Sequence, residues 1–287
     1  MPARTSSAVA AADPTPTLSR RHEAGAPSAR GLLFTLLGEF VLPGGGTAWT
    51  SAVLAVLARL GIEEKTTRQA LMRTAASGWL DPEKVGRRTR WRLTASAQKL
   101  LTEGAERIYS FTGPEENWDG RWLLVYARIP ESDRRARHVV RSRLTWAGFG
   151  SLGGGLWISP HPDREAEATS VLREAGVAAD AHVFVARRSG LADVQVMVAS
   201  AWDLDAIEDR YQEFIEEFGT SAPGDVLARQ VEIVHAWRRF PAIDPLLPRE
   251  LLSARWSGLR AARLFADRHQ RWSGEAKQEW KRLNEPG

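Results

Sequence analysis

Hydrophobic residues recur every three to four positions in three segments near the N-terminus, which predicts three amphipathic helices. The first helix begins at Ser28 and ends before a proline and three glycines, and the second follows a cap at Thr50 or Ser51. Gly61 marks a tight turn, and the third helix is expected over residues 64–77. Two helices joined by a short turn with glycine are typical of a helix-turn-helix unit.

Alternating hydrophobic and basic residues then predict a β-hairpin, with short strands at residues 79–80 and 87–93 and a loop at 81–86. The hydrophobic face of the second strand holds Thr89, Trp91 and Leu93, and its basic face holds Arg88, Arg90 and Arg92. A fourth helix follows from Thr94 or Ser96. This order of elements predicts a winged helix-turn-helix domain over residues 29–112.

The pattern changes after the fourth helix. Hydrophobic strands at residues 122–129, 156–158 and 182–186, with one more expected at 191–199, alternate with helices at 130–147 and 163–175. This alternation predicts a ferredoxin-like α/β sandwich over residues 118–199.

Helical periodicity returns over residues 200–275. Asp203 is expected to cap a helix that contains Tyr211, and two more helices are expected at 225–239 and 256–269, with the last dozen residues frayed. Residues 1–28 are rich in Ala, Ser, Thr, Pro and Arg and are expected to form a disordered tail. The predicted fold class is therefore α+β and multidomain.

Composition excludes several classes of protein. With 43% hydrophobic and 26% charged residues the chain fits a soluble globular protein, and the absence of cysteine excludes disulfides and Cys-ligated zinc or iron–sulfur sites. No run approaches the ~18–20 apolar residues that span a bilayer. Arg20-Arg21 and the apolar stretch after them resemble a twin-arginine export signal, but Glu39 interrupts that stretch and no cleavage site follows. A cytoplasmic protein without a membrane partner is expected.

Positive charge is concentrated near the N-terminus. Residues 30–100 contain eleven basic and five acidic residues, a net charge of +6, against +4 for the whole chain. The outer face of the third helix and the basic face of the hairpin supply long donors suited to base edges and phosphates. The predicted DNA-contacting residues are Lys65, Thr66, Arg68, Gln69, Arg73, Arg87, Arg88 and Arg90. The alternatives are that this basic helix only faces solvent, or that the chain is a structural interaction protein.

Several ordered motifs resemble one family. They include Arg30 to Glu39, Arg68 to Arg73 with Gly78-Trp79-Leu80, Gly86-Arg87-Arg88, Trp122 to Tyr126, Leu156-Trp157-Ile158, Ala201 to Leu204, and His235 to Pro241 followed by Asp244-Pro245. Across residues 30–270 their order resembles the PaaX family of bacterial transcriptional regulators, the repressors of phenylacetate catabolism. The resemblance implies a homodimer that binds a double-stranded DNA operator, with a Cas2-like middle domain and a helical C-terminal domain.

The resemblance also implies release from DNA by a CoA thioester, phenylacetyl-CoA in the founding case. Such an effector carries several phosphate charges and an acyl end, so it requires Arg or Lys beside aromatic side chains. The predicted effector-binding residues are Trp202, Tyr211, His235, Trp237, Arg238 and Arg239. The alternative is that these residues pack the C-terminal helices together.

A metal-dependent nuclease is the alternative function, because Cas2-like folds include nucleases with an Asp at the end of the first strand. Here that stretch contains Arg128, whose charge does not suit a metal site. Glu131 and Asp133 are expected to cap the next helix instead. The six histidines show no metal-binding spacing. No catalytic residue, metal or cofactor is therefore predicted, and the chain is not expected to be an enzyme.

Overall fold

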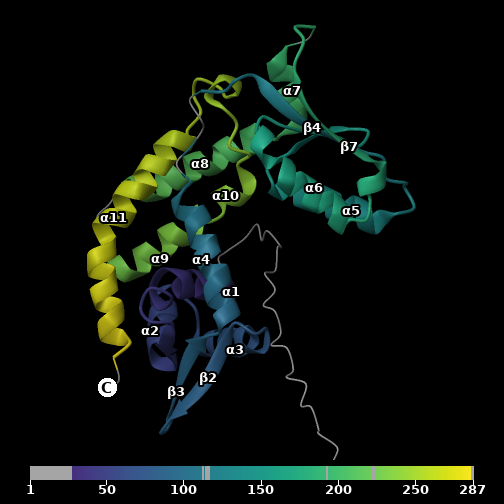
Figure 1. Ribbon diagram of the computed structural model, residues 1–287. Helices are drawn as coiled ribbons and strands as arrows, with labels where there is room; N and C mark the ends of the chain where they lie inside the picture. The colour runs from purple at the N-terminus through teal and green to yellow at the C-terminus, as the bar shows by residue number, and fades with distance from the viewer. Residues whose placement is uncertain (1–27, 112, 114–116, 192, 221–223, 286–287) are drawn as a thin grey trace, which may run out of the picture. The chain divides into compact units, whose positions relative to one another are not determined.

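The computed structural model describes residues 28–111, 113, 117–191, 193–220 and 224–285 (Figure 1). The chain divides into two compact units: unit 1 comprises Met1–Glu106, Pro223–His235 and Gln270–Gly287, and unit 2 comprises Arg107–Ala222 and Ala236–His269. Three helices contribute residues to both units: α4 (Ala95–Tyr109), α9 (Val226–Trp237) and α11 (Gly258–Leu283). The predicted disordered tail lies outside the described residues except for Ser28.

Three helices begin unit 1: α1 (Ala29–Leu36), which continues as a π-helix (Leu37–Val41), α2 (Thr50–Arg59) and α3 (Glu64–Ala76). The Ser28 hydroxyl caps α1 by accepting from the Gly31 N–H at 3.0 Å. The predicted cap of α2 at Thr50 or Ser51 is wrong, because the N-cap residue is Trp49. The Thr50 hydroxyl instead accepts from the Trp91 Nε1–H at 2.9 Å and donates to the Thr89 carbonyl at 3.0 Å.

The sheet of unit 1 has three antiparallel strands in the order β1 (Thr47–Trp49), β3 (Arg88–Leu93) and β2 (Leu80–Val85). Val85 pairs with Arg88, so only two residues form the hairpin turn, and the first, Gly86, has a φ of 60°. The predicted loop at 81–86 is therefore wrong, since residues 81–85 are paired in β2. Pro82 is tolerated because β2 lies at the edge of the sheet.

The end of the chain belongs to the core of unit 1. Leu227 and Val231 of α9 and Ala276 and Trp280 of α11 pack into the same hydrophobic cluster as α1, α2 and α3. The predicted fraying of the last dozen residues is wrong, because Ala276 and Trp280 continue a buried stripe and the helix extends to Leu283. The Asn284 side chain then bonds to β1, accepting from the Trp49 N–H at 2.8 Å and donating to the Thr47 carbonyl at 3.0 Å.

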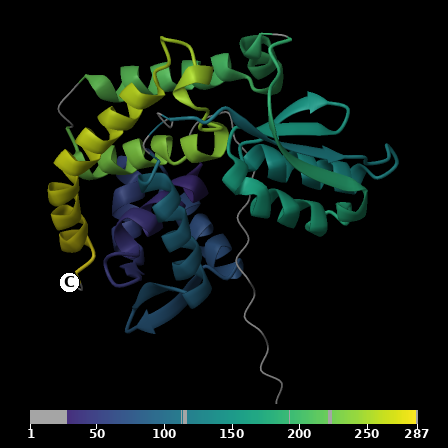
Figure 2. The ribbon, with the colours of Figure 1, turned by 45° about the horizontal axis from the view of Figure 1, so that its top comes forward.

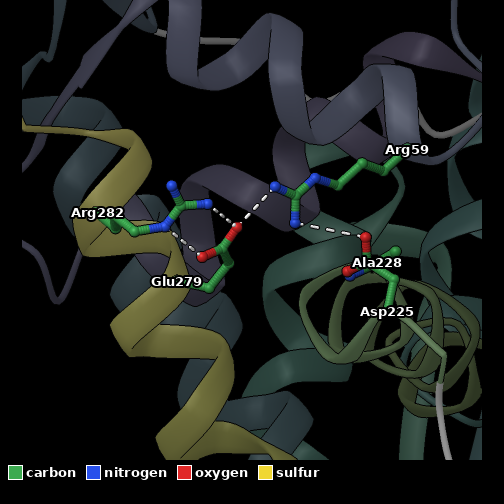
Figure 3. A network of polar contacts seen from close by, with 5 residues as sticks. All are labelled: Arg59, Asp225, Ala228, Glu279 and Arg282. Atoms are coloured by element: carbon green, nitrogen blue, oxygen red, sulfur yellow. Dashed lines mark hydrogen bonds and ion pairs between the residues drawn. The ribbon is translucent and has the colours of Figure 1, made fainter.

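An ion-pair network joins α2 to both C-terminal helices within unit 1 (Figure 3). The Arg59 guanidinium lies 2.7 Å from Glu279 and 3.4 Å from Asp225, and Arg282 also bonds to Glu279 at 2.7 Å. Asp225 caps the start of α9 by accepting from the Ala228 N–H at 2.9 Å. Bonds from Arg282 and Arg59 lower the pKa of Glu279 to about 2. The positive charge of Arg59 is thus engaged inside the unit.

Unit 2 contains a four-stranded antiparallel sheet covered on one face by two helices. The elements are β4 (Arg121–Ala127), α5 (Arg134–Trp146), β5 (Gly150–Gly153), β6 (Leu156–Ser159), α6 (Glu165–Glu174) and β7 (Ala181–Arg187). The strand order is β5-β6-β4-β7, and α5 and α6 lie side by side on one face (Figure 2). A β-α-β-β-α-β chain order is that of a ferredoxin-like unit.

The fourth middle-domain strand expected at residues 191–199 is wrong. This segment contributes to a helix, α7 (Val194–Ala201), whose first turn is capped by the Asp193 carboxylate accepting from the Gln195 N–H at 2.9 Å. Val198 is buried against Trp122 and Ile158 on the sheet face opposite α5 and α6. The helical spacing of Val194, Met197, Val198 and Ala201 matches this packing.

Helices and short turns complete unit 2. The prediction that Asp203 caps the next helix is confirmed, since its carboxylate accepts from the Ala206 N–H at 3.2 Å at the start of α8 (Leu204–Gly219). The remaining elements are the helix α10 (Phe240–Ile243) and 3-10 turns at Pro162–Arg164, Ala178–Asp180 and Arg249–Leu251. Among the described residues, no helix has both the length and the apolar character required to cross a membrane.

Candidate nucleic-acid interface

Helix α3 presents a polar face anchored from behind by buried side chains. Thr67, Ala70, Leu71 and Thr74 face the core of unit 1. The opposite side is exposed and carries Lys65, Thr66, Arg68, Gln69, Met72 and Arg73. Together with Glu64, most of these residues line an open concave surface. The separation of buried and exposed residues expected from the sequence is confirmed.

One member of this face is already ion-paired. Arg68 donates from Nε to Glu64 Oε1 at 2.8 Å, and its terminal nitrogen lies 2.7 Å from the same oxygen. Both side chains are exposed, so the pair is weak and a phosphate or base edge can compete for Arg68. Lys65, Gln69 and Arg73 make no side-chain bond to another described residue.

The hairpin arginines divide into two groups. Arg90 makes three hydrogen bonds of 2.8–3.0 Å to the Glu83 carboxylate and lies 5.7 Å from the centre of the Trp49 ring. Arg92 donates to the same carboxylate at 3.2 Å. The hydrogen bond from Arg90 lowers the pKa of Glu83, and the same bond raises the pKa of Arg90.

Arg87 and Arg88 lie at the tip of the hairpin, which extends away from the helices of unit 1 (Figure 1). Both are exposed, and neither side chain bonds to another described residue. The role of Glu83 was not predicted from the sequence. The pairing register of β2 and β3 would have indicated it, because a two-residue turn after Val85 places Glu83 opposite Arg90.

The predicted effector residues are divided between the two units. His235 belongs to unit 1, where its Nδ1 lies 3.0 Å from the Thr35 hydroxyl in a buried contact. The other five belong to unit 2. Tyr211 and Trp237 there have no exposed surface and lie in an aromatic cluster with Phe240, whose ring stacks on Tyr211 at 4.2 Å.

The Tyr211 hydroxyl donates to a buried carboxylate, Asp244, at 2.6 Å. Burial and the neighbouring Asp244 hold the pKa of Tyr211 above its ordinary value, so the hydroxyl stays protonated. Burial also raises the pKa of Asp244, against the bonds from Tyr211 and from the Leu246 N–H at 2.6 Å. This arrangement gives Tyr211 a structural task in the core of unit 2.

Unlike Tyr211, Arg238 lacks a bonded partner for its charge: it is a partly buried cation without an acidic partner among the described residues. Its Nε atom is buried and has no hydrogen-bond partner there. Burial, together with the adjacent charge of Arg239, lowers the pKa of Arg238 to about 10. Arg239 and Trp202 are also partly exposed, and the Trp202 Nε1–H donates to the Gly148 carbonyl at 3.2 Å. An anion beside Arg238 would satisfy the buried donor.

The residues considered for a nuclease site have structural positions in unit 2. Asp133 caps α5 by accepting from the Ala136 N–H at 2.9 Å, as predicted, and Glu131 lies 3.8 Å from Arg137. Arg128 is exposed just beyond the end of β4. Within the described ranges, no group of three or more His, Asp or Glu residues is arranged to hold a metal ion.

Comparison with known proteins covers most of the chain. Residues 28–97 match the family model described as PaaX-like protein, residues 115–198 match the PaaX protein central Cas2-like domain, and residues 202–282 match the PaaX-like protein C-terminal domain. The transcriptional repressor PaaX of Escherichia coli (strain K12) is 33% identical over 258 residues, which are 85% of this chain and 80% of that protein.

A solved structure of an uncharacterized protein from Mycobacterium tuberculosis also matches. It superimposes with a TM-score of 0.63 at 22% identity, over 88% of this chain and 99% of that one, and thus shows the same fold. Because three family models match in succession and the identity to the E. coli protein extends over most of both sequences, this chain belongs to the PaaX family.

Proposed function

We propose that this protein is a DNA-binding transcriptional repressor, with α1–α4 and the β2–β3 hairpin of unit 1 forming a winged helix-turn-helix domain. The observation that carries the proposal is the exposed donor face of α3. A face of this kind, on a helix held from behind by the core, suits insertion into a major groove. The family relationship to a protein named as a transcriptional repressor supports the same function.

Different residues are assigned different contacts. Arg68, Gln69 and Arg73 have the reach and the donors for guanine or adenine edges, with Lys65 and Thr66 beside them for phosphates. Arg87 and Arg88 at the hairpin tip contact the DNA backbone. Arg90 remains in the predicted set, but contact with DNA requires it to share or exchange its bonds to Glu83.

A homodimer is part of the proposal, because two α3 helices about 34 Å apart would contact successive major grooves of a pseudo-palindrome. The edge strand β7 supports association with a second copy, since Phe184 is 56% and Val185 is 46% exposed. Antiparallel pairing of two β7 strands about a two-fold axis would satisfy the open edge and place a side chain of the second copy beside each of these residues. Sedimentation of a Phe184→Arg variant tests this interface, and an unchanged dimer mass would contradict it.

The DNA-binding proposal is tested by selecting bound sequences from a random duplex library and measuring affinity by fluorescence anisotropy. The Arg68→Ala/Arg73→Ala variant is expected to lose about 1–3 kcal/mol per base contact and to relax its sequence preference. A Lys99→Ala/Lys277→Ala variant removes the same charge from other exposed positions of unit 1 and is the control. Unchanged affinity in the α3 variant would refute the assignment.

Incubation of the same DNA with the protein and Mg²⁺ or Mn²⁺ tests the alternative that the protein is a nuclease, since a repressor leaves DNA intact.

We also propose that a CoA thioester with an aromatic acyl group, of the phenylacetyl-CoA type, releases the protein from its operator. The support in unit 2 is Arg238, whose buried Nε atom has no partner among the described residues and whose charge suits a phosphate. Trp202 and Arg239 are the other partly exposed candidates. Calorimetric titration with a series of acyl-CoAs, followed by an operator-release assay, tests this effector. Absence of both binding heat and release with every aromatic thioester would contradict it.

A further inference from the structure

Helix α5 of unit 2 carries a second concentration of positive charge. Its thirteen residues include five arginines and no acidic residue. Ala136, Val140 and Leu144 form a buried stripe against the sheet. On the opposite side Arg134, His138 and Arg141 follow one another at helical spacing, and Arg135 and Arg137 flank them. We name Arg134, Arg135, Arg137 and Arg141 the α5 arginine face.

Most of this charge is not neutralised within the described part of unit 2. The fifth arginine, Arg143, bonds to Glu174 of α6 at 2.7 Å, and Arg137 has only a loose contact of 3.8 Å with the exposed Glu131. The side chains of Arg134, Arg135 and Arg141 have no hydrogen bond or ion pair to another described residue. An anionic partner would relieve the repulsion between them.

Two of these arginines lie where the stability of the helix disfavours them. Arg134 and Arg135 occupy the first turn of α5, where the helix dipole disfavours positive charge. The adjacent Asp133 carboxylate is already engaged as the helix cap. Stability of the helix alone would favour acidic residues here, so the arginines point to a binding role.

We propose that the α5 arginine face binds the phosphate backbone of duplex DNA, as a surface additional to α3 and the hairpin. The proposal takes duplex DNA as the partner from the proposed function, but it concerns different residues in the other unit. From Arg134 to Arg141 the helix rises about 10 Å. A duplex presents about six phosphates over that length, about three on each strand, so several arginines of the face can contact phosphates at once. Guanidinium groups suit phosphate oxygens because two N–H donors can bond in parallel.

The surroundings favour a duplex over other polyanionic partners. The exposed side chains of α5 include no Phe, Tyr, Trp or aliphatic residue, whereas single strands are usually held by aromatic stacking. A helix that binds a membrane surface inserts an apolar face, and here the apolar stripe is buried against the sheet. Backbone contact without base contact predicts affinity that does not depend on sequence.

The test uses the full-length protein and a long duplex of random sequence. An Arg134→Gln/Arg135→Gln/Arg141→Gln variant removes three charges from the face. The control is an Arg210→Gln/Arg255→Gln/Arg263→Gln variant, which removes three charges from other exposed positions of unit 2. Affinity is measured at several salt concentrations after circular dichroism has shown that each variant is folded. The slope of log affinity against log salt is expected to fall by about 0.9 for each lost phosphate contact, hence by up to about 2.7, only in the α5 variant.

The outcomes separate this proposal from the proposed function. Equal slopes for wild type and α5 variant, with α3-dependent sequence preference intact, would overturn the α5 proposal alone. A wild-type protein that binds no duplex would overturn both. Vesicles with anionic lipid are the second probe: loss of vesicle binding in the α5 variant without loss of duplex binding would assign the face to a membrane surface and overturn the proposal. A reduced slope with unchanged sequence preference supports it.

Discussion

Replacement of Tyr211 by Phe isolates the contribution of one buried hydroxyl. The ring keeps its stacking on Phe240, and only the 2.6 Å bond to Asp244 is lost. The Asp244 carboxyl is buried, and after the change the Leu246 N–H is its remaining hydrogen-bond donor among the described residues. A hydrogen bond to a charged group contributes about 1.5–3 kcal/mol and a neutral one about 0.5–1.5 kcal/mol. We therefore expect a loss of about 2 kcal/mol at neutral pH.

The stability that the Tyr211→Phe variant loses depends on pH, because the hydroxyl bonds to an ionisable carboxyl. Burial holds the pKa of Asp244 above its ordinary value of 3.8. The protonated carboxyl therefore favours the folded state, and it does so fully at pH values below 3.8. Its contribution is lost as the pH rises through the folded-state pKa. Because the bond from Tyr211 lowers this pKa, removing the hydroxyl raises it further. The Tyr211→Phe variant should therefore lose more stability at about pH 8 than at a pH near 4.

Thermal denaturation followed by circular dichroism at both pH values measures this effect. A loss of about 2 kcal/mol corresponds to a fall in Tm of about 4–8 °C for a unit of this size. Tyr126→Phe is the control, since Tyr126 is exposed on the sheet of the same unit. A fall in Tm that is larger at acid pH, or equal in the two variants, would refute the structural role of the bond. If the variant kept its stability but bound an acyl-CoA more weakly, Tyr211 would instead be assigned to the effector site.

Three further predictions concern other parts of the molecule. Glu83→Gln should release Arg90 and Arg92 for phosphates and steepen the salt dependence of DNA binding by about 0.9 for each, whereas a shallower slope would show that Glu83 is needed to shape the hairpin. Trp280→Ala should destabilise the protein by about 3–5 kcal/mol in urea denaturation, since its side chain is buried, and a loss below about 1 kcal/mol would be inconsistent with that packing. Arg238→Ala should weaken calorimetric binding of acyl-CoAs more than Arg238→Lys, and equal binding by wild type and both variants would exclude Arg238 from the effector site.

Sequence patterns predicted the elements that have one clear period. Helix α3 was expected at residues 64–77 and extends over Glu64–Ala76, because its buried and polar positions separate cleanly at helical spacing. Residues 191–199 were predicted to supply one more strand, and they contain the β-branched residues Val194, Val196 and Val198, which favour strands. The helix is stabilised because Val198 packs against Trp122 and Ile158 of the sheet, and these partners are distant in the sequence.

The candidate site was predictable only where it depends on a single element. The donors of α3 were visible from spacing alone. The restraint of Arg90 by Glu83 depends on a strand register, and the register depends on a two-residue turn where the sequence predicted a loop over residues 81–86. The unsatisfied Nε atom of Arg238 depends on burial by distant parts of the chain. Pairing and burial are tertiary facts, so composition and periodicity do not determine them.

The closure of unit 1 by the end of the chain has a consequence for biosynthesis. Trp280 completes its core, and Asn284 bonds to β1, so these contacts form only after residues 280–284 have left the ribosome. Folding of the N-terminal unit is therefore completed only after residue 284 has emerged from the ribosome. A message truncated before the codon for Trp280 would yield a chain with every α3 donor present and an open hydrophobic core. Such a chain would be a substrate for proteases and not a weakened repressor.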